Sequence, residues 1–181
     1  MSGKLGVIFA VIRASIMPAV LSLGFLGLFF GQSNFAQSNR KAAGEPRFTE
    51  LSREDCARLE QQRAVIAAAT KRRYGTTALT RTRRDLPVLQ ALIDEGVFKK
   101  SQTYELQSLG VAFGDVLVSE LPLRWVMVTD EFGTDPTLRF KQTTLQVNAL
   151  TVISKRVERD ERVNLSNLLS VTREQIARHD K

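Results

Sequence analysis

The sequence predicts an α+β domain: two helices, then a buried central helix, a small antiparallel sheet of about three strands, and C-terminal helices. Two observations predict this class. Residues 103–121 are apolar nearly all round a helix, which is typical of a buried helix. Residues 124–129 are then rich in β-branched and aromatic side chains, and residues 138–149 alternate apolar with polar ones, as strands do. We expect the sheet to pack one face against the central helix.

Residues 1–36 have the layout of an export signal. Lys4 and Arg13 precede an apolar run at 16–30, and small residues follow that run. A cleaved signal peptide fits this layout, and an uncleaved membrane anchor also fits, because no charge occurs between residues 14 and 39. We therefore expect an exported protein. In a bacterium, its place would be the periplasm, or the inner membrane with the domain held by this segment and facing the periplasm.

The rest of the chain reads as a polar linker over 37–48 and a single domain over 49–181. The formal net charge is +7, from 26 basic and 19 acidic residues. This positive charge is small compared with that of typical nucleic-acid-binding domains, so we expect no nucleic-acid partner. Cys56 is the only cysteine, so an intramolecular disulfide is excluded. The only histidine, His179, lies two residues from the C-terminus, which argues against a histidine-based catalytic triad or zinc site. We expect no metal ion and no cofactor.

Two helices are predicted before the central one. Ser52, with an acid three residues later, is typical of a capping box, and Gly75 is the expected end of that helix. A second short helix runs from Leu86-Pro87 to Gly96. On the first helix we expect an apolar buried stripe and a solvated opposite face. The predicted stripe is Cys56, Leu59, Ile66 and Ala69, and the predicted solvated residues are Arg58, Gln61 and Gln62.

The central helix carries Gly110 and Gly114, which are four residues apart and therefore on one face. Each glycine costs about 1 kcal/mol against alanine inside a helix. The spacing therefore predicts that another part of the backbone approaches this face closely. After the strand at 124–129 we expect a turn over 130–135, two half-buried strands, helical structure over 150–157, and a last helix from Asn164 or Ser166.

Three acids in the predicted turn, Asp130, Glu131 and Asp135, form one candidate site. They could gather for a hard cation or for acid–base catalysis. The alternative is an ordinary hairpin turn, in which aspartate and glycine supply the backbone conformations that a turn requires.

Two further candidate sites are weaker. A basic stretch is a candidate for contact with anionic lipids or phosphates, and its alternative is a solvated helix end with a connector. It comprises Lys71, Arg72, Arg73, Arg81, Arg83 and Arg84. Arg124 and Trp125 are a candidate ligand-binding pair, and the alternative is a core tryptophan with its indole N–H satisfied. Cys56 lies on the apolar stripe, which predicts a buried, inert thiol.

Three segments resemble a bacterial family of uncharacterised domains, domain of unknown function 3806. They are ELQSLGVAFGDVLVSEL (105–121), RWVMVTDEFGTDPTLRF (124–140) and LTVISKRV (150–157), within a similarity that covers roughly 54–176. Members tend to carry Phe-Pro where this chain has Asn148-Ala149. The resemblance implies the α+β fold and these boundaries, and it implies no catalytic residues.

Two classes of function follow. The first is a non-enzymatic binding or protein-interaction module of the cell envelope, with another protein as a partner and no nucleic acid. The second is a carboxylate-dependent enzyme or metal-binding protein that uses Asp130, Glu131 and Asp135.

Overall fold

A computed structural model describes residues 45–75 and 78–180 of the 181-residue chain. The predicted export segment (1–36) lies outside the described residues, as does most of the predicted linker. The elements run in the order β1 (Arg47–Thr49), α1 (Arg53–Tyr74), a 3-10 turn η1 (Arg83–Asp85), α2 (Leu86–Asp94), α3 (Thr103–Glu120), β2 (Leu123–Asp130), β3 (Gly133–Phe140), β4 (Gln146–Val147), α4 (Ala149–Val152), α5 (Ser154–Glu158) and α6 (Leu165–His179).

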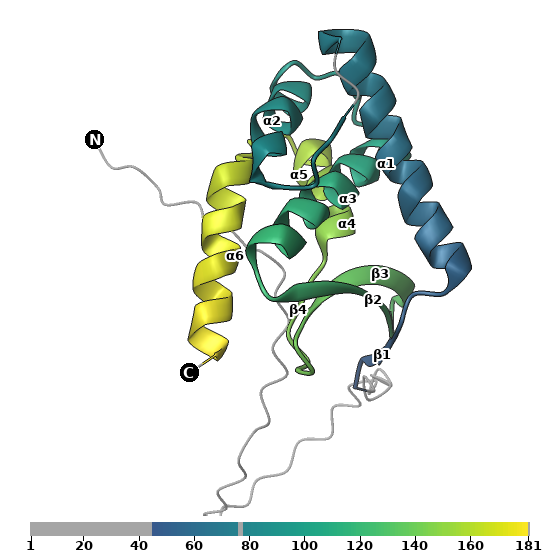
Figure 1. Cartoon of the computed structure of the whole chain (residues 1–181), viewed down its shortest axis with the longest axis vertical. Coiled ribbons are helices and arrows are strands. Elements are labelled where there is room, and N and C mark those ends of the chain that lie inside the picture. Colours follow the sequence, from purple (N-terminus) through teal and green to yellow (C-terminus); the bar gives the residue numbers. More distant parts are fainter. Residues whose placement is uncertain (1–44, 76–77, 181) are drawn as a thin grey trace, which may run out of the picture.

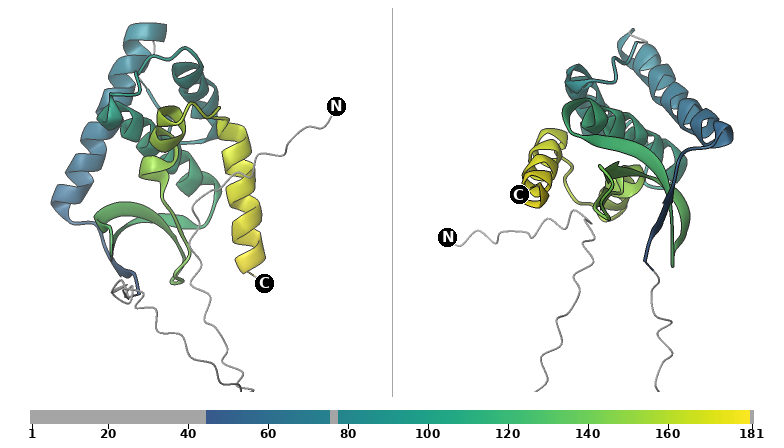
Figure 2. Two further views of the ribbon diagram at one scale, coloured as in Figure 1. Left: turned by 180° about the vertical axis from the view of Figure 1, so that it is seen from behind. Right: turned by 60° about the horizontal axis from the view of Figure 1, so that its bottom comes forward.

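The helices form one layer and the sheet closes one end of it. Figure 1 shows α3 in the middle of this layer, with α1 on one flank and α6 on the other. The view from behind in Figure 2 gives the same arrangement. The α+β class and the central position of the helix at 103–120 are therefore confirmed. Within the described residues, no helix has both the length and the hydropathy required to cross a membrane.

The sheet is antiparallel, as predicted, but it has four strands in the order β1-β2-β3-β4. The missed strand, Arg47–Thr49, begins inside the stretch that the sequence suggested as a linker. It is only three residues long and follows Pro46, so it shows no alternation for a sequence pattern to detect.

The predicted turn over 130–135 is also too long. Asp130 already pairs with Gly133, so only Glu131 and Phe132 form the turn, and Asp135 belongs to β3.

Helix α1 begins and ends as predicted. The Ser52 hydroxyl accepts a hydrogen bond from the Asp55 N–H, and the Asp55 carboxylate accepts one from the Ser52 N–H. These contacts, with the hydrogen bond from Arg58, lower the pKa of Asp55. Gly75 ends the helix with a φ of 73°.

The buried face of α1 differs from the prediction at two positions. Cys56 is exposed, because burial begins only at Leu59, after the first turn of the helix. Gln62, predicted to be solvated, is 7% exposed and lies on the same buried line as Ile66 and Ala69.

Helix α3 supplies the centre of the hydrophobic core. An unbroken run of its residues, from Ser108 to Leu117, is buried. The face of the sheet that carries Leu138 and Phe140 belongs to the same cluster as Leu109 and Phe113 of α3. The sheet therefore packs one face on the central helix, as predicted. On the other face, the Arg139 guanidinium lies 4.2 Å from the centre of the Phe48 ring.

The two glycines of α3 allow the close approach that their spacing predicts. A Cβ atom placed on Gly110 would lie 2.4 Å from the carbonyl oxygen of Ala149 and 2.6 Å from that of Leu150. A Cβ atom on Gly114 would lie 2.4 Å from the Trp125 ring. Gly110 therefore meets the backbone of α4, whereas Gly114 meets a side chain of β2.

We expect Gly110→Ala to destabilise the protein although alanine is the better helix former. The added methyl would lie 2.4 Å from a backbone oxygen of α4, so we expect overpacking at the upper end of about 1–3 kcal/mol. About 1 kcal/mol is regained in helix propensity, which leaves a net loss of about 2 kcal/mol. Circular dichroism should show a melting temperature at least about 3 °C below that of wild type. Ser119→Ala, at an exposed position of the same helix, is the control. Equal melting temperatures for Gly110→Ala and wild type would show that α4 does not press on α3.

Candidate functional site

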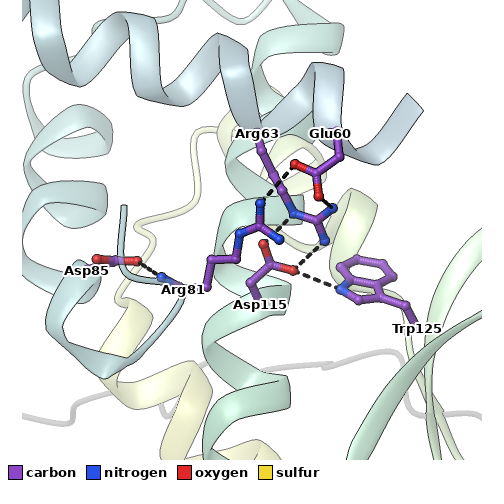
Figure 3. Close-up of polar contacts among 6 residues, drawn as sticks. All are labelled: Glu60, Arg63, Arg81, Asp85, Asp115 and Trp125. Carbon is purple, nitrogen blue, oxygen red and sulfur yellow. Dashed lines mark hydrogen bonds and ion pairs between the residues drawn. The ribbon is translucent and has the colours of Figure 1, made fainter. Parts of the chain in front are cut away.

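A buried carboxylate, Asp115, joins three elements of the fold (Figure 3). It comes from α3 and accepts two hydrogen bonds from Arg63 of α1, at 2.6 Å from Nε and 2.7 Å from Nη2. Its Oδ1 also accepts the indole N–H of Trp125 of β2, at 3.0 Å. The exposed fractions of the two side chains are 14% for Arg63 and 7% for Asp115. Burial opposes the charge on Arg63, but the hydrogen bonds and attraction of Asp115 outweigh it and raise the pKa of Arg63.

The ion pairs continue from Arg63 to the surface through Glu60. Glu60 accepts a hydrogen bond from Arg63 Nη1 at 3.0 Å with one carboxylate oxygen. Its other oxygen accepts one from Arg81 Nη2 at 2.8 Å. Arg81 and Glu60 are both exposed by about half, so this outer pair is worth at most about 1 kcal/mol.

Arg81 is held in place by the buried carboxylate of Asp85. This carboxylate accepts the backbone N–H of Thr80 at 2.9 Å, its hydroxyl at 2.8 Å, and the backbone N–H of Arg81 at 2.7 Å. Arg81 has a φ of 57°, a conformation that few residues other than glycine adopt. The three hydrogen bonds to Asp85 fix the conformation of this loop, and the Arg81–Glu60 pair connects it to α1.

These charged residues line a cavity of about 260 Å³ between α1, α3 and the loop at 78–85. We call it the ion-pair cavity. Its apolar walls come from four alanines and one leucine: Ala64, Ala67, Ala78, Leu79 and Ala112. Every charged side chain in it has an acidic or basic partner or a backbone donor, so its polar groups are largely satisfied within the chain.

A second cavity, also about 260 Å³, lies between the N-terminal half of α1, the start of α3, α4 and the β2–β3 hairpin. We call it the glutamine pocket, because three glutamines, Gln61, Gln62 and Gln107, line it. Its apolar lining includes Leu59, Met127 and Leu150, each 7% exposed or less. The remaining lining residues are Asp55, Arg58, Tyr104, Thr134, Asp135 and Pro136.

The polar groups of the glutamine pocket differ from those of the ion-pair cavity. Across residues 45–75 and 78–180, none of the three glutamine side chains takes part in a hydrogen bond. Gln62 is the decisive one, because it is 7% exposed and therefore more than nine-tenths buried. Its amide atoms are not among the fully buried polar atoms that lack a partner in the described chain, so they face the open cavity, where a ligand can reach them.

Of the three acids that the sequence singled out, Asp135 alone lines one of the two cavities described above. The carboxylate of Asp130 accepts the backbone N–H of Phe132 at 2.8 Å within the turn. Glu131 is exposed in the turn itself, and Asp135 lines the glutamine pocket from β3. No group of three or more metal-ligating side chains (histidine, cysteine, aspartate or glutamate) occurs in the described part of the chain.

Arg124 and Trp125 are neighbours on β2 and point to opposite faces of the sheet. Trp125 bonds Asp115 on the inner face, whereas Arg124 bonds Glu50. They therefore do not frame one ligand site together.

The predicted basic stretch is spread over two elements. Lys71, Arg72 and Arg73 end α1, and Arg81, Arg83 and Arg84 belong to the loop and η1; all six are exposed. Arg73 pairs with Glu95 at 2.6 Å, and Arg81 pairs with Glu60.

Sequence reasoning missed Arg63, Asp115 and Gln62. One signal was available for Asp115, which is the single acid between Leu106 and Leu117 in an apolar helix. A charge in such a position needs a buried partner of opposite sign. The identity of that partner, 52 residues earlier in the chain, was not contained in any local pattern.

We expect Asp115→Leu to destabilise the protein by about 3 kcal/mol, because it leaves the Arg63 guanidinium buried without a counter-charge. This is the lower end of the range for buried pairs, since Arg63 keeps some contact with solvent. The double variant Asp115→Leu with Arg63→Leu should recover part of this loss, because it removes both charges. Urea unfolding followed by circular dichroism measures all three free energies, with Arg63→Leu completing the cycle. Independent, additive losses would show that the pair is not coupled.

Comparisons with known proteins support the fold and one family. No functionally curated protein matches the sequence. A crystal structure of a protein from Bacteroides thetaiotaomicron VPI-5482 is similar, with a TM-score of 0.66 and 13% sequence identity. The likeness covers 74% of this chain and 49% of that one, so this chain spans about half the length of that protein. At 13% sequence identity, this likeness shows only that the two proteins share a fold.

The family resemblance is confirmed over a shorter range than the sequence suggested. The match begins at the buried Asp85 and ends in α6, so it includes Asp115 and Trp125 and leaves out α1. Residues 85–168 of this chain match the model of the family described as Domain of unknown function (DUF3806).

Proposed function

We propose that this chain is a non-enzymatic binding module of the bacterial cell envelope, and that the glutamine pocket holds the group it recognises. The observation that carries the proposal is Gln62, a side chain only 7% exposed that lines a cavity and has no hydrogen-bond partner in the described chain. The amide of Gln62 reaches the cavity and makes no hydrogen bond within the described chain. Its two N–H donors and its acceptor oxygen are therefore free to pair with a ligand.

The distribution of carboxylates favours binding over catalysis. A general acid or base must be free to exchange its proton with a substrate. Both oxygens of Asp115 and both oxygens of Asp85 instead accept hydrogen bonds from the chain itself. In the alternative carboxylate-dependent enzyme, only Asp135 of the three turn acids would reach the glutamine pocket.

The place of action is proposed from the sequence. Residues 1–36 have the layout of a signal peptide or an anchor, which would deliver the domain to the periplasm or hold it at the inner membrane. The recognised group would then be a free small molecule of the envelope or a group carried by a partner such as another protein.

We expect Gln62→Met to change the free energy of unfolding of the full chain by less than about 0.5 kcal/mol, because the substitution removes no hydrogen bond within the chain and the amide faces the open cavity. Gln90→Met is the matched control. The Gln90 amide donates to Val163 at 3.0 Å and to Asp94 at 2.9 Å, and it accepts the N–H of Leu165 at 2.9 Å. Its replacement should therefore lower stability by about 1–3 kcal/mol. Calorimetric unfolding measures both changes.

A binding experiment with the same variants tests the function itself. An extract of the cell envelope that retains both its small molecules and its proteins should raise the melting temperature of wild type and of Gln90→Met, because a ligand that binds only the folded state stabilises it. The extract should leave Gln62→Met unchanged. The proposal is wrong if wild type shows no shift, or if Gln62→Met shifts as much as wild type.

A further inference from the structure

We infer that the glutamine pocket binds a neutral sugar ring. This inference rests on the proposed binding function and names the chemistry of its ligand. Four properties of the pocket lead to it: its size, its unpaired amides, its apolar lining and its charge.

The volume of the pocket suits one small ring. Pockets for drug-sized molecules measure about 300–1,000 Å³, and the glutamine pocket has about 260 Å³. A single pyranose with one substituent suits this space. An extended peptide advances about 3.3 Å per residue, so a recognition segment of several residues would reach well beyond a cavity of this volume.

The amides of the pocket match hydroxyl groups. A glutamine side chain offers one acceptor oxygen and two N–H donors, and a hydroxyl both donates and accepts. Gln61 and Gln62 come from α1 and Gln107 comes from α3, so amides approach the cavity from two elements. A ring that carries several adjacent hydroxyls can bond amides on both sides at once.

The apolar lining matches the C–H face of a sugar. Leu59, Met127 and Leu150 contribute buried apolar surface to the cavity. Tyr104, at its edge, is 48% exposed, which is high for an aromatic side chain that could pack inside a domain. Its ring can cover the C–H groups of the ligand while its hydroxyl reaches a sugar oxygen.

The charges around the pocket favour a neutral ligand over an anion. Arg58 is the only basic lining residue, and it is paired with Asp55. Asp135 adds a second carboxylate to the lining. An anionic ligand would therefore meet a slightly negative pocket, and it would have to compete with Asp55 for the Arg58 guanidinium.

The experiment measures binding of defined probes to the purified full chain in buffer free of glycerol, sucrose and sugar-based detergents. Glucose, galactose and N-acetylglucosamine are the neutral ring probes. Glucuronate tests the effect of charge, and N-acetylglycinamide tests a peptide-like amide. Saturation-transfer NMR detects binding, and isothermal titration gives the affinity. We expect at least one neutral sugar to bind, and to bind at least roughly tenfold more tightly than glucuronate and the amide.

Variants assign the binding to the pocket. Gln62→Met should weaken sugar binding roughly tenfold, as expected for the loss of a hydrogen bond between the ligand and this amide. Tyr104→Ser should weaken it several-fold, and Gln90→Met, which is remote from the pocket, should leave it unchanged. The inference is overturned if no neutral sugar binds, if the amide or glucuronate binds more tightly, or if Gln62→Met binds the sugar as wild type does. The two experiments can fail separately. If no sugar binds, but the extract still raises the melting temperature of wild type and not that of Gln62→Met, the binding function is retained and the sugar is rejected as its ligand.

Discussion

The arrangement of this domain depends on how closely other elements can approach α3. Gly114 has no side chain, so the Trp125 ring lies directly against the helix at that point. This contact brings the indole N–H to Asp115, the next residue of α3, which in turn takes two hydrogen bonds from Arg63. A packing constraint on one glycine thus fixes the sheet, and through a charge pair it also fixes α1, the helix that lines both cavities.

The two cavities have the same volume and different chemistry, and the difference follows from which groups are paired. In the ion-pair cavity, Arg63, Arg81 and Glu60 satisfy one another, so a charged ligand would first have to break existing pairs. In the glutamine pocket, the side chain of Gln62 is mostly buried, and its amide faces the cavity without a partner in the described chain. A ligand can therefore bond to this amide without first breaking a contact within the protein.

Local sequence patterns predicted the elements well because caps and periodicity act over a few residues. Ser52, Gly75 and the apolar run of α3 each specify structure in their own neighbourhood. The patterns failed where distant parts of the chain meet. Strand β1 exists because β2 pairs with it, and Asp115 is tolerated because Arg63 reaches it from 52 residues away. The burial of Gln62 was missed for the same reason, since a polar residue on a helix is assigned to water unless its packing partner is known.

The position of Trp125 has a spectroscopic consequence. It is the only tryptophan in the chain, and its indole N–H is bonded to a buried carboxylate at the junction of α1, α3 and β2. The emission of the protein, excited at the red edge of its absorption, therefore reports the polarity of this one junction. Water that enters between α1 and α3 would shift the emission to longer wavelengths before the helices themselves lose their ellipticity.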